Sequence, residues 1–338
     1  MRVLWVRLRS LGDILLNLPA LDAFKQIQPD AHVTYVVHPE FVELLEDYPT
    51  IDGLATVSRE SRGYLRVLFR TDTWLRESYD WVINFHGGTL SAFITLWTHS
   101  KGKVGLERFR FRSVYTHTVN DQIIGRPLHT VEVQARLLYP IVGAIPRESL
   151  RKPVFPAVQQ PPRPRVRSLL EWLQGRPFVL VHPGARFRYK RWPYERTLTL
   201  LSRWLRQWPN LAFGLFMGPT EQDLPPQART FPLDRVTVLD RWPLTDVVQL
   251  LTYTDLYVGF DNGITHLAAL LDRPIVVVWG PIDPTRWAPW TDLQIRLHHP
   301  SQRVDAVPDE ALTQAVRLML GATLYGTDRF RHITMPST

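Results

Sequence analysis

The sequence contains no cysteine among its 338 residues. Disulfide bonds, thiolate nucleophiles and cysteine-ligated metal centres are therefore excluded, and a reducing compartment is compatible with the composition. No apolar run approaches the ~18 residues of a membrane-spanning helix. The apolar N-terminal segment 1–21 contains Arg7, Arg9 and Asp13, whereas a secretory signal peptide has an uninterrupted apolar region, so we predict a cytoplasmic protein.

Several nucleotide- and metal-binding signatures are also missing from the sequence. Without G-x-G-x-x-G, a dinucleotide-dependent oxidoreductase is disfavoured, and without G-x-x-x-x-G-K-[ST], so is a P-loop kinase. Neither D-x-D nor H-E-x-x-H occurs. We therefore predict no metal site and no cofactor.

The composition is that of a folded protein, with 45% hydrophobic and 21% charged residues. The net charge of +8 suggests an anionic partner, which could be nucleic acid, a phosphorylated metabolite or an anionic membrane surface. An Arg-rich composition without such a partner is the alternative. Because the basic residues are scattered and no recognition motif appears, we do not expect nucleic acid to be the partner.

The order of apolar patterns predicts an α/β fold. In the first half, a strand at 2–8, a helical pattern at 11–21 and a strand at 32–37 form a βαβ unit, which implies a parallel sheet. Residues 41–45 and 131–138 are expected to be helical and 81–85 to be a strand. In the second half we expect strands at 178–182, 211–217, 236–239, 256–259 and 275–279, with helices at 195–207, 244–251, 263–271 and 309–320.

A proline-rich stretch separates the two halves, and extended proline-rich segments suit linkers, although a long surface loop is the alternative. We predict an N-terminal domain at 1–155, a linker at 156–168, a C-terminal domain at 169–320 and a tail at 321–338 that packs back on the first domain. The two doubly wound domains are expected to face each other across a cleft, with ligands at the carboxyl ends of the strands.

The first loop of chemical interest is Ser10-Leu11-Gly12-Asp13, between the first strand and the first helix. Gly12 permits a tight turn and close approach of a ligand. Asp13 could take a proton from a hydroxyl nucleophile. The same spacing also fits a capping box, in which Asp13 only stabilises the start of the helix.

The second loop follows the strand at 178–182 and carries four cations within residues 186–191. These are Arg186, Arg188, Lys190 and Arg191, and Trp192-Pro193 then opens a helix. Cations beside a helix N-terminus favour a diphosphate site, while a solvated basic loop is the alternative.

The third loop, 259–266, joins a buried strand to a helix. Asp261 or Asn262 is expected to cap that helix, so that the amides of its first turn, from Gly263 onward, could bind phosphate. His266 could donate to a phosphate oxygen or be a packed core histidine.

Three weaker signals lie elsewhere in the sequence. Glu221 could accept hydrogen bonds from ribose hydroxyls or be a surface residue. His86, which begins His-Gly-Gly, could line an acceptor site or only a turn. If the alternating segment 108–112 is extended, Arg108, Arg110 and Arg112 share one face suited to an anionic acceptor, and an amphipathic edge strand is the alternative.

Together the three loops resemble glycosyltransferase family 9, the ADP-heptose:lipopolysaccharide heptosyltransferases. The resemblance covers nearly the whole chain, in the segments RVLWVRLRSLGDILLNLPAL, HPGARFRYKRWP and TDLYVGFDNGITHLAALLDRPIVVVWGP. The last is the most specific, since it places Asp261, Gly263 and His266 in a D-x-G-x-x-H pattern.

The resemblance implies a GT-B fold and an inverting, metal-independent glycosyl transfer. It assigns Asp13 as the catalytic base, Lys190 as a ligand of the donor phosphates and Glu221 as a neighbour of the donor nucleoside. Asp261, Asn262, Gly263 and His266 match the donor loop. Asn262 stands where the family often has Thr or Ser, and the segment 186–188 stands where small hydroxyl residues are common, which weakens the assignment of the donor sugar.

The implied partners are a nucleotide-sugar donor, with ADP-heptose first, and an anionic glycan or glycolipid acceptor of the lipopolysaccharide-core type. Contact with the inner face of the membrane is a further expectation. Another donor or acceptor, a nucleotide-sugar epimerase and a non-catalytic nucleotide-sugar-binding protein stay open as alternatives.

Overall fold

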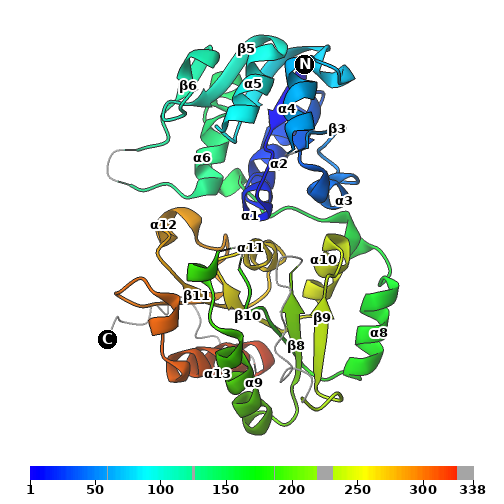
Figure 1. The fold of residues 1–338 in the computed structure, drawn as a ribbon, viewed down its shortest axis with the longest axis vertical. Helices are drawn as coiled ribbons and strands as arrows, with labels where there is room; N and C mark the ends of the chain where they lie inside the picture. The colour runs from blue at the N-terminus through cyan, green and yellow to red at the C-terminus, as the bar shows by residue number, and fades with distance from the viewer. Residues whose placement is uncertain (59, 124–125, 186, 219–230, 326–338) are drawn as a thin grey trace. The chain divides into compact units, whose positions relative to one another are not determined.

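A computed structural model describes residues 1–58, 60–123, 126–185, 187–218 and 231–325. The chain divides into two compact units (Figure 1). The N-terminal unit comprises Met1–Pro156 with Thr285–Ala288, and the C-terminal unit comprises the rest. Each unit contains a six-stranded parallel sheet with helices, so the predicted α/β class is confirmed.

The sheet of the N-terminal unit has the order β3-β2-β1-β4-β5-β6, in which every neighbouring pair is parallel. Its strands are β1 (Arg2–Val6), β2 (His32–Val37), β3 (Gly53–Thr56), β4 (Ser78–Asn84), β5 (His99–Leu106) and β6 (His117–Val119). The strand order reverses between β1 and β4. This is the doubly wound arrangement, whose ligands bind where the order reverses.

The helices of this unit are short. They are α1 (Leu11–Leu15), α2 (Leu18–Ile27), α3 (Val42–Leu45), α4 (Ser61–Leu68), α5 (Thr89–Trp97), α6 (Thr130–Arg136) and α7 (Tyr139–Val142). The prediction of one continuous helix at 11–21 is wrong. Pro19 lies in the first turn of α2, where its missing amide costs nothing, and it prevents continuation from α1.

The sheet of the C-terminal unit has the order β12-β11-β10-β7-β8-β9, again all parallel. Its strands are β7 (Phe178–Val181), β8 (Ala212–Met217), β9 (Val236–Asp240), β10 (Leu256–Phe260), β11 (Ile275–Trp279) and β12 (Gln294–His298). β7, β8, β10 and β11 are buried along their whole length, as expected for strands covered on both faces. The order reverses between β7 and β10.

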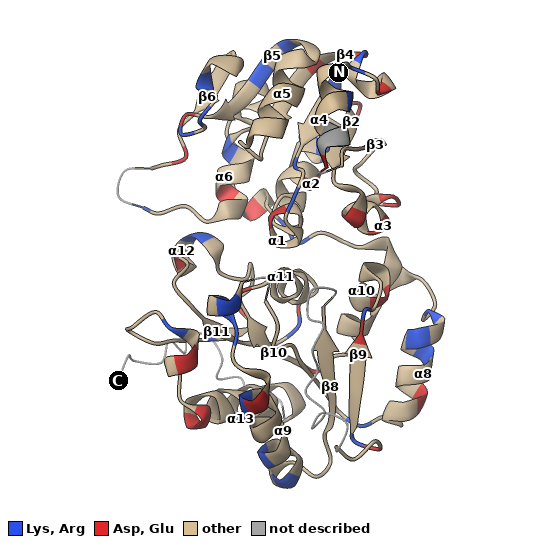
Figure 2. Cartoon of the chain, viewed as in Figure 1, with Lys and Arg blue, Asp and Glu red and all other residues tan. Residues whose placement is uncertain are grey.

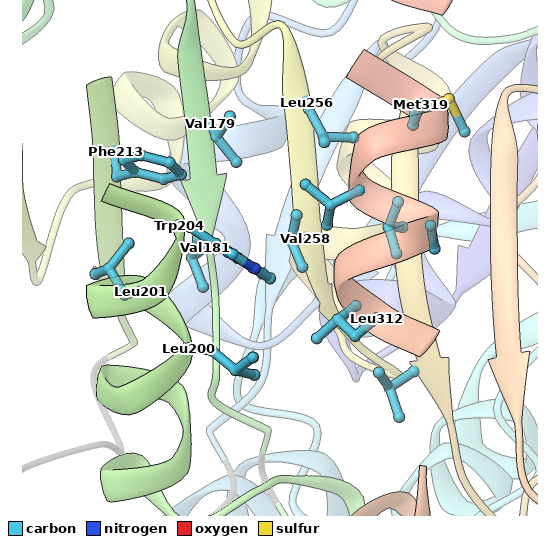
Figure 3. Packing of buried hydrophobic residues seen from close by; sticks show 14 of the residues in the cluster. Val179, Val181, Leu200, Leu201, Trp204, Phe213, Leu256, Val258, Leu312 and Met319 are labelled. Atoms are coloured by element: carbon cyan, nitrogen blue, oxygen red, sulfur yellow. The ribbon is translucent and has the colours of Figure 1, made fainter. Parts of the chain in front are cut away.

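Helices pack on this sheet to form the core of the C-terminal unit. They are α8 (Pro164–Leu173), α9 (Tyr194–Gln207), α10 (Leu244–Thr252), α11 (Gly263–Leu270) and α13 (Asp309–Tyr325). The single turn α12 (Pro284–Trp287) belongs, apart from Pro284, to the N-terminal unit. Figure 3 shows the strand residues Val179, Val181, Leu256 and Val258 between Leu200 and Trp204 of α9 and Leu312 of α13.

Helix α8 begins within the segment expected to be a linker. Pro164 occupies its first turn, where proline fits a helix, and Val166 and Leu169 are buried. Residues 321–325 continue α13, and the remaining expected tail lies outside the described residues. No helix in the described part of the chain is both long and apolar enough to cross a membrane. Figure 2 shows basic and acidic residues interspersed in both units.

Candidate active site

The loops after β7 and β10 meet at the same edge of the C-terminal sheet because these strands are parallel neighbours. The β10 loop ends in Asn262, which caps α11. Its side-chain oxygen accepts from the Thr265 amide at 3.0 Å, and its side-chain nitrogen donates to the Gly184 carbonyl at 3.0 Å. Asn262 therefore both starts the helix and joins the two loops. Of the two residues predicted as possible caps, Asn262 has this role, which leaves Asp261 available for another contact.

That contact is an ion pair with Lys190, whose Nζ lies 2.5 Å from Asp261 Oδ2. The two side chains are only 15% and 10% exposed, so solvent screens the pair weakly. Lys190 ends a 3₁₀ turn (Arg188–Lys190) after β7. The ammonium group is thus fixed directly before the N-terminus of α11, where free helix amides also favour an anion.

His266 lies in α11 and is 4% exposed. Its pKa is lowered to about 4, mainly by burial, while the Asp261 carboxylate opposes the shift and the Lys190 charge adds to it. The imidazole is therefore neutral at neutral pH. Its Nδ1 is buried with no hydrogen-bond partner in the described structure, which leaves a polar atom beside the Lys190–Asp261 pair that a ligand could satisfy.

A buried hydrogen-bond network beneath this loop was not predicted from the sequence. The Tyr257 hydroxyl lies 3.0 Å from His182 Nδ1 and 3.2 Å from the Thr265 hydroxyl. The Thr265 hydroxyl also lies 2.5 Å from the Phe260 carbonyl. Tyr257 belongs to an apolar strand pattern and gave no signal of a polar role. The network holds the β7 end, β10 and α11 in a fixed relation.

A cavity of about 780 Å³ lies beside the start of α9, and Arg188 and Arg191 line it together with residues 301–305. Neither Lys190 nor Asp261 lines this cavity. The cations predicted to form one cluster are thus divided, since Arg188 is exposed toward the cavity and Lys190 is paired beside α11. Arg186 and Glu221 lie outside the described residues.

In the N-terminal unit, Asp13 follows β1 and has both carboxylate oxygens engaged. One forms an ion pair with the guanidinium of Arg7, and the other accepts from the Ser10 amide at 3.0 Å and the Ser10 hydroxyl at 2.7 Å. The amide contact is the capping interaction expected from the spacing. The side chain is still 22% exposed, so capping does not bury the carboxylate. Gly12 is buried in the same turn.

Arg7 is the residue that sequence reasoning missed at this position. It is 6% exposed and also donates to the Phe85 carbonyl after β4. Burial lowers its pKa to about 10, so it stays charged at neutral pH. A buried cation must be compensated, and the ion pair with the Asp13 carboxylate provides this.

His86 follows β4 at the point where the strand order reverses. Burial, followed by the charges of Arg7 and Arg9, lowers its pKa to about 3, which makes it neutral. The turn predicted after it is present, because Gly87 has φ +71°. A Cβ at Gly87 would also lie 2.4 Å from the ring of Phe109, so the turn requires glycine.

The expectation of an extended segment at 108–112 is wrong. These residues form turns and enter a 3₁₀ turn (Arg112–Val114), because Phe109 packs inward against Gly87 and Arg108 pairs with Asp121 at 2.6 Å. Asp121 also binds Arg286, which belongs to the same unit. Arg110 and Arg112 are exposed, but they do not form the single arginine face of a strand.

Comparison with known proteins identifies the family. Residues 69–311, well over half of the chain, match the model of glycosyltransferase family 9 (heptosyltransferase). Lipopolysaccharide heptosyltransferase 1 of Pseudomonas aeruginosa is 27% identical over 300 residues, which cover 84% of this chain and 80% of that protein.

Two solved structures share the fold. The glycosyl transferase family 9 structure from Veillonella parvula has a TM-score of 0.78 and 18% identity and covers 94% of this chain and 97% of that one. The E. coli heptosyltransferase WaaC with ADP-2-deoxy-2-fluoro heptose has a TM-score of 0.72 and 23% identity, with coverage of 94% and 99%. These likenesses confirm the GT-B fold. The expected resemblance is confirmed as well: the chain belongs to glycosyltransferase family 9 and is a glycosyltransferase.

Proposed function

We propose that the protein transfers heptose from ADP-heptose to a hydroxyl group of a lipopolysaccharide-core glycolipid, with inversion and without a metal ion. The observation that carries the proposal is the cationic Lys190 held beside the N-terminus of α11, next to the neutral His266. The related WaaC structure was solved with an ADP-heptose analogue, which supports the choice of donor.

In this proposal the C-terminal unit binds the donor. The diphosphate lies against the α11 amides from Gly263 onward and displaces Asp261 from Lys190. His266 donates to a phosphate oxygen, which would satisfy its buried ring nitrogen. Asn262 holds the loop in place. Lys190 and the helix amides stabilise the negative charge that develops on the departing ADP. They take the role that a metal ion has in metal-dependent transferases.

The N-terminal unit binds and activates the acceptor. Asp13 removes the proton of the attacking acceptor hydroxyl. The hydroxyl oxygen then bonds to the anomeric carbon of the donor while the bond from that carbon to ADP breaks. This single displacement inverts the configuration of the anomeric carbon. The ion pair with Arg7 orients the Asp13 carboxylate. The charges of Arg7 and Arg9 beside His86 favour an anionic acceptor.

Further contacts to the acceptor are assigned to the same unit. Gly12 allows close approach at the turn, and the exposed Arg110 and Arg112 supply cations, with Arg108 available if Asp121 retains Arg286. On the donor side, Arg186 contributes to the diphosphate site and Glu221 contacts the nucleoside, whereas Arg188 faces the cavity beside α9. The acceptor domain is 1–155 and the donor domain 169–320, and the enzyme works in the cytoplasm at the membrane face.

The test is a transfer assay with ADP-heptose and heptose-deficient lipopolysaccharide core, in the presence of a metal chelator. We expect a product whose anomeric configuration is opposite to that of the donor. Donor turnover without acceptor would instead identify an epimerase, and product of retained configuration would contradict the single displacement. Complete loss of transfer in chelator would contradict metal independence alone.

A further inference from the structure

Helices α4 and α5 of the N-terminal unit pack against each other (Figure 1). Large apolar side chains of these two helices are left exposed to solvent. Seven of them are between 40% and 67% exposed. They are Tyr64, Leu65, Leu68 and Phe69 at the end of α4, and Phe93, Leu96 and Trp97 on α5. We call this set the α4–α5 face.

The spacing of these residues shows that the exposure follows from helix geometry. Phe93, Leu96 and Trp97 are three and four residues apart and lie on one side of α5, whereas Leu90 and Ile94 face the core. Residues 89–97 contain no charged side chain. An exposed helix side made only of large apolar residues calls for an apolar environment.

The charged residues around this face are mainly basic. Residues 64–76 and 93–103 contain five Lys or Arg and one acidic residue. Arg66 and Arg70 neighbour the exposed apolar residues of α4 in the sequence. Lys103 Nζ donates to the Leu96 carbonyl at the end of α5. Asp72 binds Arg66, and Asp80, just beyond these segments, binds Lys101. An anionic surface complements this rim, whereas a second copy of the same face would place cations opposite cations.

We infer that the α4–α5 face docks the N-terminal unit on an anionic lipid bilayer, with the aromatic and leucine side chains at the headgroup level and the cations on the lipid phosphates. Tyr and Trp side chains favour this interface because each combines an apolar ring with a polar O–H or N–H group. Apolar contact and a basic rim are the two signals that together give stable peripheral binding. The inference rests on the proposed function to the extent that a glycolipid acceptor resides in such a bilayer.

The test is co-sedimentation of the full chain with vesicles of phosphatidylethanolamine and phosphatidylglycerol, and with vesicles of phosphatidylcholine alone. The variants are Leu65→Ser with Phe69→Ser, and Phe93→Ser with Trp97→Ser. Because these side chains are exposed, the fold should tolerate serine. The matched control is Val154→Ser with Leu233→Ser, two exposed apolar residues that do not belong to α4 or α5 (61% and 81% exposed).

We expect binding to the anionic vesicles that weakens as salt rises, and a loss of roughly tenfold or more in each paired variant. The control should bind like the wild type. An absence of wild-type binding, or equal binding by variants and control, would overturn the inference. So would a wild-type dimer in vesicle-free solution that the paired variants convert to monomer, because the face would then be a protein interface. ADP binding, measured on the same samples, reports separately on the proposed function.

Discussion

The Lys190–Asp261 pair offers the sharpest test of the donor site, because its two members should affect ligand binding in opposite directions. Lys190→Ala removes the cation and leaves Asp261, which is 10% exposed, without its partner. Removing one member of a buried pair costs about 3 kcal/mol of folding free energy. A charge-assisted contact to phosphate contributes about 1.5–3 kcal/mol, so ADP affinity should fall roughly tenfold to a hundredfold.

Asp261→Asn acts differently, because the carboxylate competes with a diphosphate for the same ammonium group and repels it. ADP should therefore bind Asp261→Asn at least as tightly as wild type, while Lys190→Ala binds more weakly. Calorimetric titration of both variants with ADP measures this contrast, and thermal unfolding supplies the stability changes. Equal weakening of ADP binding in the two variants would refute the reasoning, since it would mean that the intact pair, and not the free cation, forms the site.

Four further predictions follow from single residues. Asp13→Asn should abolish glycosyl transfer and leave ADP binding unchanged, and wild-type turnover in that variant would reject its role as base. Arg7→Met should lower turnover more than Arg7→Lys does, because lysine keeps the charge beside Asp13; equal activities in a steady-state assay would remove Arg7 from the account. The pKa of His266 is about 4 in the folded chain and 6.5 ordinarily, so the unfolded chain takes up this proton first as pH falls. The free energy of unfolding should therefore decrease between about pH 6.5 and 4. His266→Gln should flatten that part of the pH profile of stability, and an unchanged profile would contradict this prediction. Asn262→Ala should lower stability by about 1–2 kcal/mol in denaturant unfolding through loss of the cap, whereas Asn262→Asp should retain most of it.

The parallel strands near the candidate sites could be predicted because they are short, apolar and fully buried. β7, β10 and β11 each have an unbroken apolar sequence bounded by turn residues, and the observed bounds differ from the expected ones by at most one residue. The β5 strand was missed because its sequence, HSKGKVGL, has polar residues and two glycines at positions that packing alone makes compatible with a strand. Helix α5 was missed because its pattern is inverted: Ser91 and Thr95 are buried, whereas Phe93, Leu96 and Trp97 are exposed.

The candidate site was predictable to the extent that it depends on residues in consecutive order. Asp261, Asn262, Gly263 and His266 form one strand-to-helix turn, and their grouping follows from local structure. The pairing of Lys190 with Asp261 spans 71 residues and depends on β7 and β10 being neighbours, which the strand order determines.

Arg7 illustrates a different limit of sequence reasoning. It interrupts an apolar segment and was interpreted only as an obstacle to a signal peptide. Its role depends on the carbonyl of Phe85, which follows β4, a strand that is far from Arg7 in the sequence but next to β1 in the sheet. The prediction of an extended segment at 108–112 was wrong for a similar reason. Contacts with Asp121 and Gly87, which lie outside the segment, determine where Arg108 and Phe109 lie.

The most direct test of the central claim is a calorimetric comparison of ADP, GDP, UDP and dTDP binding to the purified protein, with and without Mg²⁺. The account predicts preferential binding of ADP that does not require Mg²⁺ and that is lost in Lys190→Ala but kept in Leu233→Ser. Preference for another nucleotide, or ADP binding that Lys190→Ala leaves intact, would contradict the assignment of the donor site.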